Sequence, residues 1–146
     1  MIRYRDAASA ETAILRALEE ADWTAYFLTS YNGSLFDIFM DKNTAKVFNQ
    51  AIPFGGFFDR EQAYALLKEM LFAHRGEIAK WLASGGGRAM RVIDLYDEAQ
   101  GYGFDKNGRE VPAKEIRLCL RKDRGTATKL GFFVSNFYPR YKETEN

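Results

Sequence analysis

The chain has 146 residues, and its 21 Lys and Arg against 20 Asp and Glu leave a net charge of +1. That balance excludes a highly basic nucleic-acid-binding arm and an acidic disordered tail. Hydrophobic residues make up 47% of the chain and aromatic residues 15%, enough apolar surface for the core of one domain over residues 1–146.

The single cysteine and the single histidine limit the metal and redox chemistry. Cys119 has no internal disulfide partner, and together with His74 it falls short of the three or four ligands of a usual zinc site. No apolar run approaches the roughly 18 residues that span a bilayer. We therefore expect a cytoplasmic protein with no membrane span and no metal or other cofactor.

The N-terminal segment carries the signals of a helix and then of a β-hairpin. Asp6 or Ser9 can cap a helix that ends near Asp22. Residues 24–40 are rich in β-formers on both sides of an Asn-Gly pair, which predicts a hairpin. Residues 41–56 suit either a helical turn or a short strand.

A second helical region begins at Asp59. Asp59 and Gln62 have capping-box spacing, and an apolar stripe follows them. Gly76 either divides this region into two helices or weakens one long helix, and three consecutive glycines from Gly85 end it. The stripe consists of Ala63, Leu66, Leu67, Met70, Leu71, Ile78, Trp81 and Leu82.

From Met90 onward the pattern changes to that of a sheet. Helices followed by consecutive strands predict an α+β domain, with N-terminal helices packed on a largely antiparallel C-terminal sheet. The expected strands are 91–96, 100–104, 116–121 and 130–138, with a turn at 105–108 and the last strand closing before Pro139.

The near-neutral total charge hides a basic C-terminal third. Residues 105–146 hold ten Lys and Arg against six Asp and Glu, a net charge of +4. Arg117 and Arg121 share one strand face by the period of two, and Lys122 follows them, so this group can bind phosphate. Charges that solubilise the open face of a sheet are the alternative interpretation.

The last predicted strand carries polar groups of its own. Asn136 and Tyr138 point to the same side of it, with Ser135 beside them. Both side chains can hydrogen-bond a phosphate or a base edge. The alternative is a strand-ending asparagine and an aromatic residue at the sheet edge.

Other features favour structure over chemistry. His74 lies on the helical stripe, which favours a packing or capping role over acid–base catalysis. Residues 84–88 are rich in glycine but follow a helix and lack a P-loop ending, so they indicate a helix stop. Gly101-x-Gly103 indicates a bulge or a close backbone approach. The carboxylates interpreted as turn residues, in preference to metal ligands, are Asp94, Asp97 and Glu98.

Over residues 55–139 the order of these signals resembles the RNase A-like toxin domains of bacterial contact-dependent growth inhibition and other polymorphic toxin proteins. Those domains show a Ser-Thr-Phe-x-Asp-Arg helix start, an Ile-x-x-Trp-Leu helix end, a Gly-Tyr-Gly strand, a strand ending in a basic-acidic pair and a closing Tyr-Pro. The counterparts here are 57–63, 78–82, 100–103, 116–123 and 133–139.

The sequence departs from this family where the chemistry would lie. The family's catalytic histidine belongs to a Gly-Gly-His-Thr segment, whereas residues 23–54 contain no histidine. Gly55-Gly56 replaces the Ser-Thr pair and Asn136 replaces the closing threonine, which leaves Tyr138 as the direct carry-over. No clear general base remains for the 2′-hydroxyl of RNA.

Two functions are compatible with the resemblance. One is a metal-independent, toxin-type ribonuclease without histidine; the other is a non-enzymatic protein-binding module, such as a catalytically silent toxin relative, an immunity protein or an adaptor. The expected partners are RNA, or a cognate immunity or toxin protein. A fragment of an exported toxin would act in the cytoplasm of a target bacterium. The expected site places Tyr138, Arg121 and Lys122 in catalysis and Asn136, Arg117 and Ser135 in substrate binding.

Overall fold

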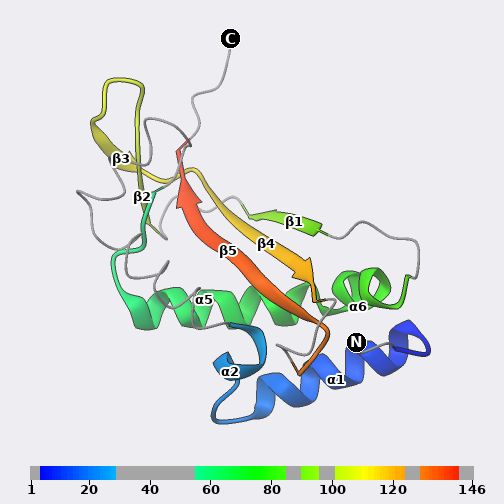
Figure 1. Cartoon of the computed structure of the whole chain (residues 1–146). Helices are drawn as coiled ribbons and strands as arrows, with labels where there is room; N and C mark the ends of the chain where they lie inside the picture. The colour runs from blue at the N-terminus through cyan, green and yellow to red at the C-terminus, as the bar shows by residue number, and fades with distance from the viewer. Residues whose placement is uncertain (1–3, 29–54, 85–89, 96–100, 124–128, 142–146) are drawn as a thin grey trace.

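The computed structural model describes residues 4–28, 55–84, 90–95, 101–123 and 129–141, with the backbone alone for 90–95. Helices come first and antiparallel strands second, which confirms the predicted α+β class (Figure 1). The extent of the domain, 1–146, stays a prediction. Several predicted features lie outside the described residues: the Asn-Gly turn, residues 41–54, the three glycines from Gly85, Asp97 and Glu98.

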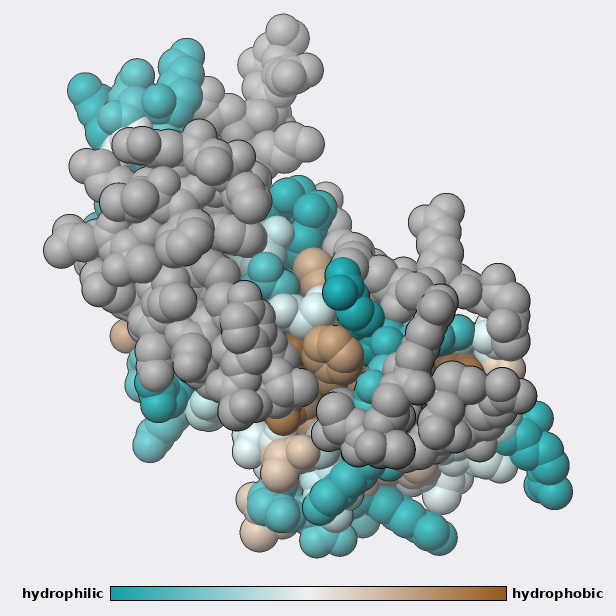
Figure 2. Space-filling model, viewed as in Figure 1, coloured by the Kyte–Doolittle hydropathy of each residue, from teal (hydrophilic) through white to brown (hydrophobic). Residues whose placement is uncertain are grey.

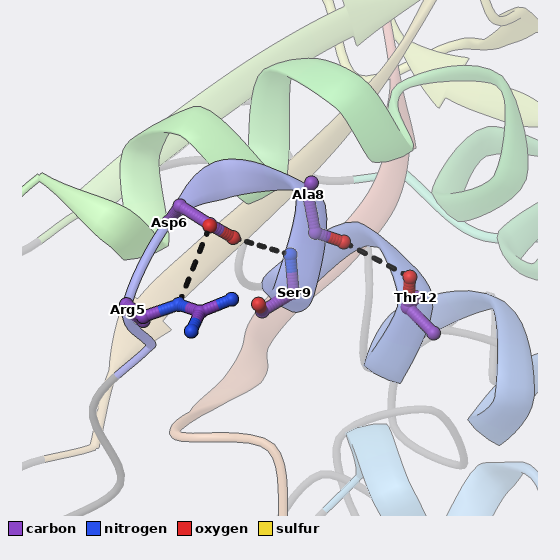
Figure 3. Close-up of polar contacts among 5 residues, drawn as sticks. All are labelled: Arg5, Asp6, Ala8, Ser9 and Thr12. Atoms are coloured by element: carbon purple, nitrogen blue, oxygen red, sulfur yellow. Dashed lines mark hydrogen bonds and ion pairs between the residues drawn. The ribbon is translucent and has the colours of Figure 1, made fainter.

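The first helix, α1 (Ala7–Glu19), begins at the predicted cap. The Asp6 carboxylate accepts a hydrogen bond from the backbone N–H of Ser9 (2.8 Å), and the Thr12 hydroxyl donates to the carbonyl of Ala8 (3.0 Å) (Figure 3). The Asp6 bond satisfies one of the N–H groups that a helix N-terminus leaves without a partner. The buried face of α1 contains Ala10, Ile14, Ala17 and Leu18.

The prediction of a strand at the start of 24–40 is wrong, because Thr24–Phe27 forms the short helix α2. Trp23 and Phe27 lie four residues apart, which places their rings on one helical side with centroids 6.2 Å apart. Phe27 is fully buried and meets Phe132 edge to face at 5.8 Å. Tertiary packing of these rings therefore overrides the β-propensity of the segment.

The second helical region is two helices, α5 (Arg60–Ala73) and α6 (Arg75–Ala83). The Asp59 carboxylate caps α5 by accepting from the N–H of Glu61 (3.3 Å). The division falls at His74, whose backbone leaves the helical region, and Gly76 lies in the first turn of α6. His74 thus occupies the junction of two helices, but its side chain makes no capping hydrogen bond to α6.

The strands of the described residues form two sheets. A three-stranded antiparallel sheet has the order β1 (Met90–Leu95), β4 (Glu115–Lys122), β5 (Phe132–Arg140). A smaller sheet pairs β2 (Tyr102–Phe104) with β3 (Glu110–Pro112) through the predicted turn, where the Asp105 carboxylate accepts from the N–H groups of Asn107 and Arg109. Figure 1 shows the three-stranded sheet lying across the helices and the smaller sheet beyond the C-terminal end of β5.

One face of the three-stranded sheet packs on the helices and forms the core. On β4 and β5 that face carries Ile116, Leu118, Leu120, Phe132, Val134 and Phe137, all of them buried. Between the sheet and the helices these side chains join the buried residues of α1, α5 and α6. In the view of Figure 2, hydrophobic surface shows beside hydrophilic side chains near the middle of the molecule, where β5 crosses the view.

The last strand is longer than predicted, because β5 continues through Pro139 to Arg140. A proline lacks the N–H that a central strand needs, but β5 is the outer strand in the order β1-β4-β5, and such a strand tolerates proline. The Pro139 carbonyl accepts from the N–H of Gly55 (2.8 Å). A Cβ on Gly101 would lie 2.7 Å from the Gly56 carbonyl oxygen and from the Pro139 ring, which confirms the predicted close approach.

Candidate functional site

The candidate site lies on the face of β4 and β5 opposite the helical layer, which we call the outer face. Strand alternation places Glu115, Arg117, Cys119 and Arg121 of β4 on it. Their register partners on β5 are Arg140, Tyr138, Asn136 and Phe133. The outer face therefore combines three arginines, one carboxylate, a phenol, an amide and a thiol along two paired strands.

Arg117 and Tyr138 are register partners at the middle of this face. Tyr138 is 5% exposed, yet it does not belong to the core cluster between sheet and helices. Arg117 is partly exposed. On its other side, in β1, the register partner of Arg117 is Asp94. The register therefore brings together two of the residues that the sequence analysis assigns to the site, Arg117 and Tyr138.

A β-bulge shapes the β5 side of the site. The register shifts between Cys119 and Leu120, whose partners are Asn136 and Val134, so Ser135 is the extra residue. The Ser135 hydroxyl donates to the Cys119 carbonyl (3.1 Å) and supports the disrupted ladder. The Asn136 side-chain oxygen accepts from the N–H of Phe137 (3.0 Å), so the amide NH₂ is the part of Asn136 suited to a ligand.

The structure separates the two remaining predicted site residues. Arg121 is exposed on the outer face, opposite Phe133 and four residues along β4 from Arg117, a distance of about 13 Å. Lys122 lies on the opposite face, where its amine donates to the Ser84 carbonyl (2.9 Å) and stands 5.4 Å from the centre of the Trp81 ring. The structure therefore does not bring Lys122 together with Tyr138.

Sequence reasoning missed a buried ion pair next to Arg117 and Tyr138. Glu115 and Arg140 are 5% and 8% exposed, and the guanidinium Nε of Arg140 contacts Oε1 of Glu115. They are register partners one alternation step beyond Arg117 and Tyr138. The predicted strand ended before Pro139 and so left out Arg140. Extended by the same period of two, the pattern would have placed both residues on the outer face.

The other candidate groups lie elsewhere or are not described. The His74 imidazole faces Glu77 on α6, with Nδ1 and Oε1 3.7 Å apart. Within the described ranges, His, Cys, Asp and Glu form no group of three that could hold a metal ion. Over the same ranges, no helix is long and apolar enough to cross a membrane.

A separate apolar hollow of about 300 Å³ lies at the smaller sheet. Its lining includes Phe58, Tyr102, Val111 and Pro112. Phe58 is 60% exposed, and its ring centroid lies 5.6 Å from that of Tyr102. This hollow belongs to the β2–β3 sheet and is not part of the outer face.

Comparisons with known proteins bear on the fold. No protein-family model matches the sequence, and no curated protein matches it either. A chain in the crystal structure of the CdiA-CT/CdiI complex from Y. kristensenii 33638 is similar in structure, with a TM-score of 0.56 and 16% identity over 67% of this chain and 88% of that chain. This likeness establishes a shared fold. It confirms, at the level of the fold, the predicted relation to contact-dependent inhibition proteins.

Proposed function

We propose that this protein is a toxin-type ribonuclease domain that binds RNA on the outer face of β4 and β5. The observation that carries the proposal is the cross-strand pairing of Arg117 with Tyr138. Paired residues of this kind place their Cβ atoms about 5 Å apart, so a guanidinium and a phenol can reach one phosphate group. The fold shared with a chain of a CdiA-CT/CdiI complex supports the toxin-type assignment.

The site residues expected from the sequence then have the following roles. Arg117 stabilises the negative charge that develops on the phosphorane, and Tyr138 donates a proton to the departing 5′-oxygen. The Asn136 NH₂ group donates to a phosphate oxygen or a base edge. Arg121, about 13 Å along the strand, holds a neighbouring phosphate. Ser135 supports the bulge that presents Asn136, and Lys122 has no place in this site.

The test is cleavage of total tRNA and of a mixed-sequence RNA without added metal. We expect Tyr138→Phe to lower the rate at least 100-fold, the usual contribution of a general acid, with little change in melting temperature. Tyr4→Phe is the matched control, since Tyr4 also loses a hydroxyl but lies away from the outer face, bonded to the Leu130 carbonyl. Equal rates for the wild type and Tyr138→Phe would contradict the proposal.

A second candidate function rests on the apolar hollow beside Phe58. A largely exposed phenylalanine over an apolar hollow is suited to a protein partner, and the similar chain was solved in a two-protein complex. The two functions differ in their dependence on salt. RNA binding through several arginines weakens steeply as salt rises, whereas an apolar protein interface changes little.

A further inference from the structure

We propose that Glu115 is the proton acceptor for the 2′-hydroxyl of RNA and that Arg140 holds it in place, an inference that rests on the proposed ribonuclease function. The sequence shows no histidine where the resembling toxin domains keep their catalytic one, so the reaction needs another base. Glu115 is the carboxylate that the fold places on the outer face of β4, next to Arg117 and Tyr138.

The geometry suits a base and an acid that act on one phosphorus. Glu115 lies two residues before Arg117 on β4, and Arg140 two residues after Tyr138 on β5. Two residues of a strand span about 7 Å on the same face. A base and an acid must each approach to about 3 Å of an oxygen on opposite sides of the phosphorus. Neighbouring cross-strand positions provide that separation.

The burial of the pair also points to a built site. Glu115 and Arg140 are the buried charged side chains of the described residues, and burying an ion pair is often no more stabilising than burying apolar side chains. Their contact joins Nε of Arg140 to Oε1 of Glu115. That contact engages one of the two carboxylate oxygens, and an ionised carboxylate can accept at both. An adjacent guanidinium favours the charged form of a carboxylate, which is the form that accepts a proton.

The chemical step balances as follows. Glu115 takes the proton of the 2′-hydroxyl, and the 2′-oxygen forms a bond to phosphorus. The bond from phosphorus to the 5′-oxygen breaks, and that oxygen takes the hydroxyl proton of Tyr138. The products are a 2′,3′-cyclic phosphate and a free 5′-hydroxyl. Water then carries the proton from Glu115 back to Tyr138, and both residues return to their starting states.

The experiment compares the full-length wild type with Glu115→Gln on a fluorescent RNA oligonucleotide. Glutamine keeps the shape and can accept from Arg140, but it cannot take up a proton at neutral pH. We expect kcat/KM to fall at least 100-fold, RNA affinity to stay within threefold, and the acid limb of the pH profile to disappear. Glu69→Gln on the exposed side of α5 is the matched control and should behave as the wild type.

Several charged or titratable groups on the outer face shape this pH profile. They are Arg117, Cys119, Arg121, Tyr138 and Arg140, together with Asp94 at the β1 position opposite Arg117. Of these, the arginines stay charged through the acid range, so an acid limb reports a carboxylate. An additional variant, Asp94→Asn, separates the two carboxylates: it should keep the acid limb that Glu115→Gln removes.

The outcomes distinguish this inference from the function on which it rests. If the wild type cleaves RNA and folded Glu115→Gln cleaves it within threefold, Glu115 is not the base but the ribonuclease function stands. If the wild type cleaves no RNA, both proposals fall. If Glu115→Gln does not fold, Glu115→Asp provides the test: retention of the acid limb at a lower rate supports the proposal, and loss of the limb contradicts it.

Discussion

The amine of Lys122 donates a hydrogen bond to the Ser84 carbonyl and lies 5.4 Å from the centre of the Trp81 ring. These contacts connect the end of β4 to the end of α6 on the core side of the sheet. We expect Lys122→Met to lower the free energy of unfolding by about 1 kcal/mol while RNA cleavage stays within twofold. Urea denaturation and the cleavage assay measure the two effects. Lost cleavage at unchanged stability would return Lys122 to the site.

The salt dependence of RNA binding tests Arg121. Each cation that neutralises a phosphate of single-stranded nucleic acid contributes about 0.7 to the slope of log affinity against log salt. Arg121→Gln should therefore reduce that slope by about 0.7 without abolishing binding. Lys80→Gln, an exposed cation on α6, serves as the control and should leave the slope unchanged. Equal slopes for both variants would place Arg121 outside the RNA-binding surface.

The period of two predicted the two strands, with Arg117 and Arg121 on one face of β4 and with Asn136 and Tyr138 on one side of β5. That these two pairs share a face follows only from the strand register. Lys122 was grouped with them by charge, although the same alternation assigns it to the core side, where the structure finds it. A single extra residue at Ser135 could not be predicted, because a bulge depends on how two strands pair and not on one strand's pattern.

Two predictions of secondary structure were wrong, the strand at Thr24–Phe27 and the end of the last strand before Pro139, and both depend on tertiary contacts. The segment at Thr24–Phe27 becomes helical because Phe27 packs on Phe132, more than a hundred residues later in the chain. Pro139 stays in β5 because an outer strand tolerates a residue without an N–H, and its carbonyl accepts from the N–H of Gly55. The local sequence of each segment does not identify its distant partner. Because the last strand was predicted to end before Pro139, Arg140 and its buried ion pair with Glu115 were not predicted.

Asp6 should make the stability of the domain sensitive to acid. The hydrogen bond from the Ser9 backbone N–H lowers the pKa of the Asp6 carboxyl below its ordinary value of 3.8. A lowered pKa in the folded state adds stability above about pH 3.8 that is lost as the pH falls through the lowered value. Asp6→Asn keeps a good cap without this titration.

Thermal melting of the wild type and Asp6→Asn between about pH 2 and about pH 6, a range that brackets the pKa of an ordinary Asp side chain, measures the effect. The difference between the two proteins should shrink as the pH falls. Asp6→Ala, which removes the cap itself, should melt below Asp6→Asn throughout. A constant difference between wild type and Asp6→Asn would show that the Asp6 charge contributes nothing to the cap.

Tyr4 should produce the opposite dependence at alkaline pH. Its hydroxyl donates to the Leu130 carbonyl (2.6 Å), and burial raises the pKa of the phenol above its ordinary value of 10.0. The neutral phenol therefore contributes stability that is complete below pH 10 and lost as the pH rises through the raised value. Tyr4→Phe should be about 1 kcal/mol less stable at neutral pH. Urea denaturation should show that gap closing above pH 10; a gap that widens would contradict this assignment.

Two glycines make a matched test of how the smaller sheet packs on β5. A Cβ on Gly101 would lie 2.7 Å from the Gly56 carbonyl oxygen and from the Pro139 ring, and the backbone oxygen cannot move aside without disturbing its bond to Tyr102. We expect Gly101→Ala to lower the free energy of unfolding by about 1–3 kcal/mol. Gly76→Ala should raise the free energy of unfolding by up to about 1 kcal/mol, because alanine has a higher helix propensity than glycine. The added Cβ would meet only the Glu11 carboxylate, at 3.9 Å. Chemical denaturation measures the free energy of unfolding of both variants. Equal changes in the two variants would mean that the smaller sheet shifts to accommodate the methyl group. The approach of Gly101 to Pro139 would then not constrain the end of β5.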